Sequence, residues 1–189
     1  MGKFILGIIV TLLCVVIGAM AYTHLGFAHV AADEPVGHIE RFMFSAALDP
    51  SVERHADHVD SPVPVNDANL IEGMKVYEMN CANCHGGMDR QISQMGRAMF
   101  PAAPQLVRRG SDDPGWFTFY QIQHGIRHSG MPAWDKLLSS DQMWKMVLFL
   151  QNVKKLPPAV QQAWTDSHGG TPAEPPKPAP QSKEMPKKK

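Results

Sequence analysis

The sequence predicts an all-α protein, a small helical domain preceded by an apolar N-terminal helix. Three observations support this fold class. Residues 4–22 carry no charge, apolar residues recur at helical spacing in three segments between 67 and 156, and no segment there shows a convincing strand-like alternation. A chain of 189 residues has room for one ordinary domain and appendages. We therefore divide it into residues 1–25, 26–66, 67–156 and 157–189.

The N-terminal segment is long enough to cross a membrane. From residue 4 to Leu25 it would form about 33 Å of helix. Lys3 precedes it and no basic residue follows before Arg41, which predicts a cytoplasmic N-terminus and an exported remainder. We expect an uncleaved single-pass anchor in the cell inner membrane, with the domain on the periplasmic side. A cleaved signal peptide is the alternative, since Ala19–Ala21 is a passable cleavage site.

Residues 26–66 form an acidic connector with one predicted helix. Its apolar residues recur at helical spacing, and Asp49-Pro50 predicts its end. They are Ile39, Phe42, Met43, Ala46 and Ala47. We expect this helix to pack on the neighbouring domain or the membrane surface, and a docking helix for a membrane partner is the alternative.

Residues 157–189 predict a solvated, unfolded tail. Their last eighteen residues include six prolines and five lysines and few large apolar side chains. Over the whole chain, 18 basic residues balance 18 acidic ones. No uniformly basic face is evident, so the composition gives no support to nucleic-acid binding.

Residues 67–156 predict three main helices with long loops at 86–111 and 126–138. The first has Asn69 and Glu72 spaced as a capping box, and one face holds Leu70, Gly73, Met74, Tyr77 and Cys81. The second begins at Pro114 and ends at Gly125. The third begins at Ser139 or Ser140 and ends in a basic turn before Pro157.

The pentapeptide CANCH, residues 81–85, has the spacing of a covalent haem site. The thiols of Cys81 and Cys84 can each form a thioether with a vinyl group on one haem edge, and His85 is then the proximal iron ligand. A thioredoxin-like redox pair is an alternative, but it needs a preceding strand where a helix is predicted here. A zinc site with His124 and His128 is another, although its gap is far longer than in a zinc finger.

The domain resembles the class I monohaem cytochromes c. The segments that carry the likeness are Gly73-x3-Tyr77-x3-CANCHG, Pro104-x-Leu106, Gly130-Met131-Pro132 and the apolar helix near the end of the domain. The resemblance covers residues 67–156 and implies that the first and last helices cross near Gly73 and Tyr77. It also implies that an aromatic residue such as Trp144 packs at this crossing. The Gly-Met-Pro methionine would be the distal iron ligand.

The stretch HGIRHSGMPAW, residues 124–134, holds three candidate distal ligands. His124 lies at the end of a predicted helix, whereas Met131 lies in a loop whose backbone Pro132 restricts. A thioether favours ferrous iron and cannot be protonated at physiological pH. We expect Met131 to be the ligand, with His124, His128 or an open position as alternatives. Other methionines are expected in the core or at the surface: Met88, Met95, Met99, Met143 and Met146.

Two filled iron positions imply a one-electron carrier, not an enzyme. The resemblance implies that haem c, held covalently on the outer face of a membrane, passes electrons between respiratory or photosynthetic-type complexes. The partners would be redox proteins in or at the membrane, and no small-molecule substrate is expected. One alternative is a haem c subunit bound permanently in a membrane oxidoreductase. Another is a haem enzyme or sensor with a labile sixth ligand.

Overall fold

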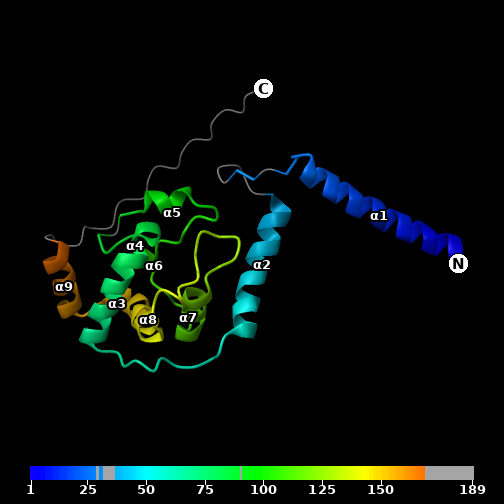
Figure 1. Ribbon diagram of the computed structural model, residues 1–189. Helices are drawn as coiled ribbons and strands as arrows, with labels where there is room; N and C mark the ends of the chain where they lie inside the picture. Colours follow the sequence, from blue (N-terminus) through cyan, green and yellow to red (C-terminus); the bar gives the residue numbers. More distant parts are fainter. Residues whose placement is uncertain (29, 32–36, 90, 169–189) are drawn as a thin grey trace. The chain divides into compact units, whose positions relative to one another are not determined.

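The computed structural model describes residues 1–28, 30–31, 37–89 and 91–168, and these residues form helices and connecting segments without a strand (Figure 1). The all-α prediction is confirmed. The chain divides into two compact units, Met1–Val36 and Gly37–Lys189. The first unit contains α1 (Gly2–His24), which is long and apolar enough to cross a membrane. A signal sequence has the same properties.

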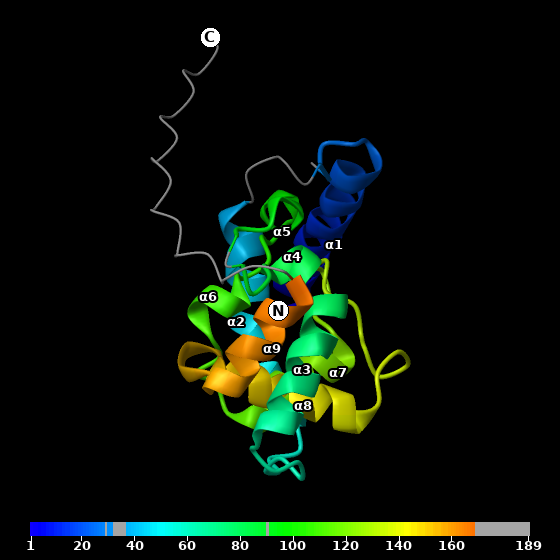
Figure 2. The same ribbon diagram turned by 90° about the vertical axis from the view of Figure 1, so that its left-hand side faces the viewer.

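The core of the second unit is the crossing of α3 (Asp67–Asn80) and α8 (Ser140–Asn152), which lie side by side in Figures 1 and 2. Gly73 permits this crossing, because a Cβ atom there would lie 2.1 Å from the backbone oxygen of Lys145. Phe149 packs against Tyr77 with ring centroids 5.5 Å apart. Trp144, the aromatic residue that we expected there, instead stacks on Phe119 of α7 (Gly115–His124) at 4.3 Å. The crossing is therefore where the resemblance implies, with a different aromatic residue against Tyr77.

The helix ends follow the sequence signals closely. Asn66 caps α3, and its side chain accepts a hydrogen bond from the Asn69 amide at 2.9 Å, so the helix begins before the predicted capping box. Helix α7 (Gly115–His124) stops at Gly125, whose φ is +66°. Ser139 caps α8 in a capping box with Gln142. A 3₁₀ turn, η1 (Val153–Lys155), follows α8.

The loop predicted at 86–111 is partly helical. It contains α5 (Gln94–Ala98) and α6 (Leu106–Arg109), while α4 (Ala82–His85) is a single turn directly after α3. Gly96 brings α5 close to α4, since a Cβ atom there would lie 1.9 Å from the Cys84 backbone oxygen. This close packing of short elements fixes the segment around residues 81–85.

Helix α2 (His38–His55) continues past the predicted stop, so the stop at Asp49-Pro50 is wrong. A proline inside a helix removes one backbone hydrogen bond. Here the residues on either side of Pro50 pack on the domain: Val52 is 3% exposed and Leu48 is half-buried. Helix α2 therefore packs on the domain as predicted, but through Leu48 and Val52. The predicted apolar face is wrong, because all five of its residues are exposed: Ile39, Phe42, Met43, Ala46 and Ala47.

Residues 158–168 were expected to belong to an unfolded tail, but they form helix α9 (Pro158–His168), so the tail prediction is wrong for them. Val160 is 0% exposed and Trp164 4% exposed, and α9 packs against α3 (Figure 2). The two side chains are four residues apart and so share one helix face, which buries enough apolar surface to fold this segment. The prediction for residues 169–189 lies outside the described residues.

Candidate functional site

The CANCH segment lies on one tight turn at the end of α3. The amides of Cys84 and His85 donate to the Cys81 carbonyl at 3.1 and 2.8 Å, so both thiols and the imidazole come from a single turn. Both cysteines are half-buried and free. Burial, and then the neighbouring Cys84, raises the pKa of Cys81 to about 12, so this thiol is protonated at neutral pH.

The imidazole of His85 is oriented by a backbone carbonyl. Its Nδ1 lies 2.8 Å from the Pro104 oxygen. When Nδ1–H donates to that oxygen, Nε2 keeps its lone pair for a metal. Burial lowers the pKa of His85, and the hydrogen bond to Pro104 opposes this only in part. The side chain is therefore neutral at physiological pH, as an iron ligand has to be.

Two further side chains hold the motif in place. The Tyr77 hydroxyl donates to the Gly86 carbonyl at 2.7 Å, and burial raises its pKa, so it stays a donor. The Gln105 side chain donates to the Cys84 carbonyl at 3.3 Å and accepts from the Ser93 amide at 2.9 Å. No pattern in the sequence singles out Gln105, and the Pro104-x-Leu106 spacing is the nearest signal.

The loop that carries Met131 closes on itself. The Ile126 amide donates to the Met131 carbonyl at 3.1 Å. The Ser129 hydroxyl accepts from the Met131 amide at 3.1 Å and donates to the Ile126 carbonyl at 2.7 Å. Gly125 starts the loop, and only glycine fits there, because a Cβ atom would lie 2.6 Å from the carbonyl carbon of Pro132.

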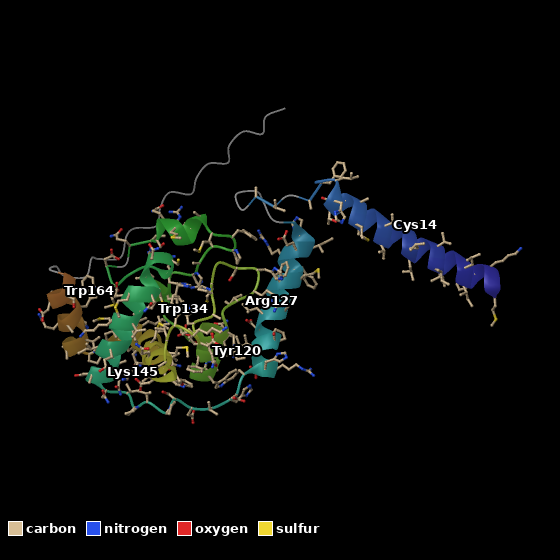
Figure 3. All side chains as sticks on the ribbon, viewed as in Figure 1. Cys14, Tyr120, Arg127, Trp134, Lys145 and Trp164 are labelled. Carbon is tan, nitrogen blue, oxygen red and sulfur yellow. The ribbon has the colours of Figure 1, made fainter. Side chains whose placement is uncertain are left out.

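A cavity of about 540 Å³ joins these two segments. Cys81, Cys84 and His85 line it, and so does Met131. Trp134, labelled in Figure 3 within the helical domain, is also part of the wall. The volume lies within the roughly 300–1,000 Å³ typical of cofactor sites. Two thiols, an imidazole and a thioether on one largely apolar cavity are the groups that a covalent haem needs, so the residues fit this cofactor.

The two histidines of the 124–134 stretch lie away from this cavity. His124 is exposed and its ring lies 4.5 Å from that of Tyr120, tilted by 49°; His128 is exposed and its ring lies 4.6 Å from that of Phe44, tilted by 48°. Neither of them lines the cavity. Within the described ranges no cluster of three or more His, Cys, Asp or Glu side chains could hold a metal, so a zinc site has no support.

Two methionines that the sequence assigns to the core or the surface also line the cavity, which was not predicted. Met99 lines the cavity, and its sulfur would lie 3.0 Å from a Cβ atom at Gly130. Met146 is 1% exposed and its sulfur lies 3.3 Å from the Cys81 sulfur. Their positions depend on tertiary packing, and no local motif marks them. Met99 is thus a second thioether to compare with Met131.

Comparisons with known proteins identify the family. Residues 68–150 match the family described as cytochrome C oxidase, cbb3-type, subunit III. A cytochrome c6 from Chlorolobion braunii is 31% identical over 77 residues, which are 41% of this chain and 82% of that protein. The chain belongs to the monohaem c-type cytochromes. Haem c is therefore its cofactor, Cys81 and Cys84 fit its attachment, and haem-mediated electron transfer, not catalysis, is its activity.

Comparison with solved structures finds a chain of the reducing HAO-like protein complex of Kuenenia stuttgartiensis. The TM-score is 0.41, with 19% sequence identity over 50% of this cytochrome and 49% of that chain. The cytochrome thus spans about half the length of that chain.

Proposed function

We propose that His85 and Met131 are the two axial ligands of the haem iron and that this cytochrome is a one-electron carrier. The observation that carries the proposal is the shared cavity. The imidazole of the CANCH turn and the thioether of the 126–131 loop line it, while His124 and His128 do not. The bound haem supplies the redox chemistry, and the protein sets its potential, its access and its docking.

Methionine is the ligand that suits a carrier on the oxidising side of a respiratory chain. A neutral thioether favours ferrous iron, so it raises the potential relative to two histidines. The apolar cavity wall also limits water around the iron. With both positions filled, outer-sphere transfer through the haem edge is the remaining route for an electron.

The proposed location and partners are supported by α1 and by the family match. We infer that α1 stays as an inner-membrane anchor and that residues 37–168 work on the periplasmic side, since no basic residue occurs between Lys3 and Arg41. The partners would be membrane-bound respiratory complexes. The matched family description names an oxidase subunit, which favours a second candidate, a haem c subunit held permanently in a membrane oxidoreductase.

An optical spectrum of the haem-loaded cytochrome tests the ligands. We expect a c-type alkaline pyridine spectrum and an Fe(III)–methionine charge-transfer band. Met131→His should abolish that band, while His124→Ala and His128→Ala keep it. Met99→Leu is the matched control, because Met99 is the other thioether near the loop. Loss of the band in Met99→Leu and its retention in Met131→His would reverse the assignment.

Two further measurements separate the functional alternatives. Rapid, complete carbon monoxide binding to the reduced protein at neutral pH would indicate an enzyme or sensor with a labile ligand. Mild detergent extraction distinguishes the other two: a free carrier purifies alone, whereas a subunit copurifies with partners in fixed ratio. We expect slow carbon monoxide binding and purification without a fixed partner.

A further inference from the structure

Helix α2 lies outside the matched family residues 68–150 and still reaches the haem cavity. Leu48 of α2 is part of the cavity wall together with Ile126 and Met131 of the distal loop. Among the described residues, no other wall residue comes from before Tyr77. Helix α2 therefore contributes a wall residue, Leu48, that lies outside the matched residues.

Helix α2 and the residues just after it run along α7 in the opposite direction, and they contact the loop after α7 and the first turn of α7. Near the end of α7, the Phe44 ring packs on His128, with centroids 4.6 Å apart and planes at 48°. Near its start, His58, just after α2, stacks on Trp116 at 3.9 Å and 14°. Val52 lies between these contacts and is 3% exposed. Figure 1 shows the two helices beside each other, and Figure 3 labels Arg127 in the loop that follows α7.

His128 is the point where α2 meets the distal loop. Its φ is +60°, a left-handed conformation in a residue that is not glycine. Such a conformation persists only where the surrounding structure holds it. On one side it is followed by the Ser129 hydrogen bonds that hold Met131. On the other side its ring packs against that of Phe44.

We propose that α2 is a brace for the distal ligand, with Phe44 as a positioning residue that acts through His128 and Leu48 as the side chain that closes the adjacent wall. The brace keeps the Met131 loop shut and thereby keeps small external ligands from the iron. The proposal rests on the proposed ligation by Met131.

Phe44→Ala in the full-length haem-loaded protein tests the brace. An aromatic contact is worth about 0.5–1.5 kcal/mol, so the open form of the loop should become roughly two- to tenfold more populated. Carbon monoxide should bind the ferrous protein faster by the same factor, and the ferric charge-transfer band should disappear at a lower temperature. Phe42→Ala is the matched control, because Phe42 lies on the same helix and is 73% exposed. It should behave like wild type.

Two more variants separate positioning from a general loss of structure. Phe44→Tyr keeps the ring and should restore wild-type carbon monoxide binding. Leu48→Ala should speed this binding with little change in helix content by circular dichroism. If Phe44→Ala and Phe42→Ala bind carbon monoxide equally slowly, the brace is excluded. A wild-type protein without the methionine band would instead exclude Met131 ligation, which is a separate outcome.

Discussion

The two sides of the haem site are built in different ways. The proximal side places two thiols and an imidazole within five consecutive residues, on a turn held by Tyr77, Pro104 and Gln105. The distal side has Met131, the proposed ligand, in a loop that is held by its own hydrogen bonds and contacted by Phe44 of α2, outside the family match. Attachment is thus a local property of the chain, whereas the sixth ligand depends on contacts distant in sequence. We therefore expect mutations to disrupt the distal side more readily than the proximal side.

The largest effect should come from removing the thiols on the proximal side. Cys81→Ser combined with Cys84→Ser leaves no sulfur to form a thioether, so covalent haem should be lost completely. Haem staining on a denaturing gel measures this loss. Cys14→Ser is the matched control, because Cys14 lies in α1, and it should keep a full haem signal. Covalent haem in the double variant would contradict the attachment site.

Gly125→Ala should open the distal side while leaving the haem attached. The added Cβ meets backbone atoms of Met131, Pro132 and Ala133 at 2.6–2.7 Å, and φ is +66°. Together, clash and strain should destabilise the closed loop by about 3 kcal/mol. The methionine charge-transfer band should weaken or vanish while the pyridine spectrum stays that of haem c.

Gly87→Ala is the control for this change on the proximal side. A Cβ atom there meets only side-chain oxygens, the nearest 3.3 Å away at Glu78. The band should remain close to that of wild type. If both variants lose it equally, the distal loop is not the more sensitive side.

Tyr77→Phe should lower global stability and spare the distal ligand. The Gly86 carbonyl would lose its donor in a buried position, which should cost about 2 kcal/mol of unfolding free energy. Denaturant titration of the haem-loaded protein measures this, and the charge-transfer band should be unchanged. Tyr120→Phe is the control, because Tyr120 is only half-buried and its ring packs at a tilt against the exposed His124. Equal losses in the two variants would argue against a special role for Tyr77.

Ser129→Ala should give the smallest effect. It removes the hydroxyl that links Ile126 to Met131, two bonds in a partly buried loop, worth about 1 kcal/mol of local stability. The band should therefore fade at a slightly lower temperature, with global unfolding nearly unchanged. Ser167→Ala, at the exposed end of α9, should leave the band as it is. A larger effect on global unfolding than on the band would place Ser129 in the core of the fold.

Much of the fold could be predicted because its signals are local. The CANCH spacing indicates the cofactor, and Gly125 and the Ser139–Gln142 capping box mark ends of α7 and α8. The prediction of Met131 among three candidates rests on the chemistry of its loop and on the resemblance to class I cytochromes c. It remains a prediction that the cavity wall supports.

The rest depends on packing between distant segments. Pro50 is ordinarily a stop signal, but burial of Val52 on the domain keeps α2 helical beyond it. Val160 and Trp164 fold α9 within a segment whose overall composition resembles a solvated tail. The cavity positions of Leu48 and Met99 arise only once helices far apart in the chain are assembled.

The packing of α2 on the domain also limits how far the haem can travel. If α1 stays in the membrane, only residues 25–37 separate its end at His24 from the start of α2 at His38. Thirteen residues extend to at most about 45 Å, so the tether is far shorter than the whole of residues 26–66. With α1 in a membrane, the domain would stay within that distance of the bilayer. Its effective concentration would then be raised for integral membrane complexes and not for freely diffusing proteins.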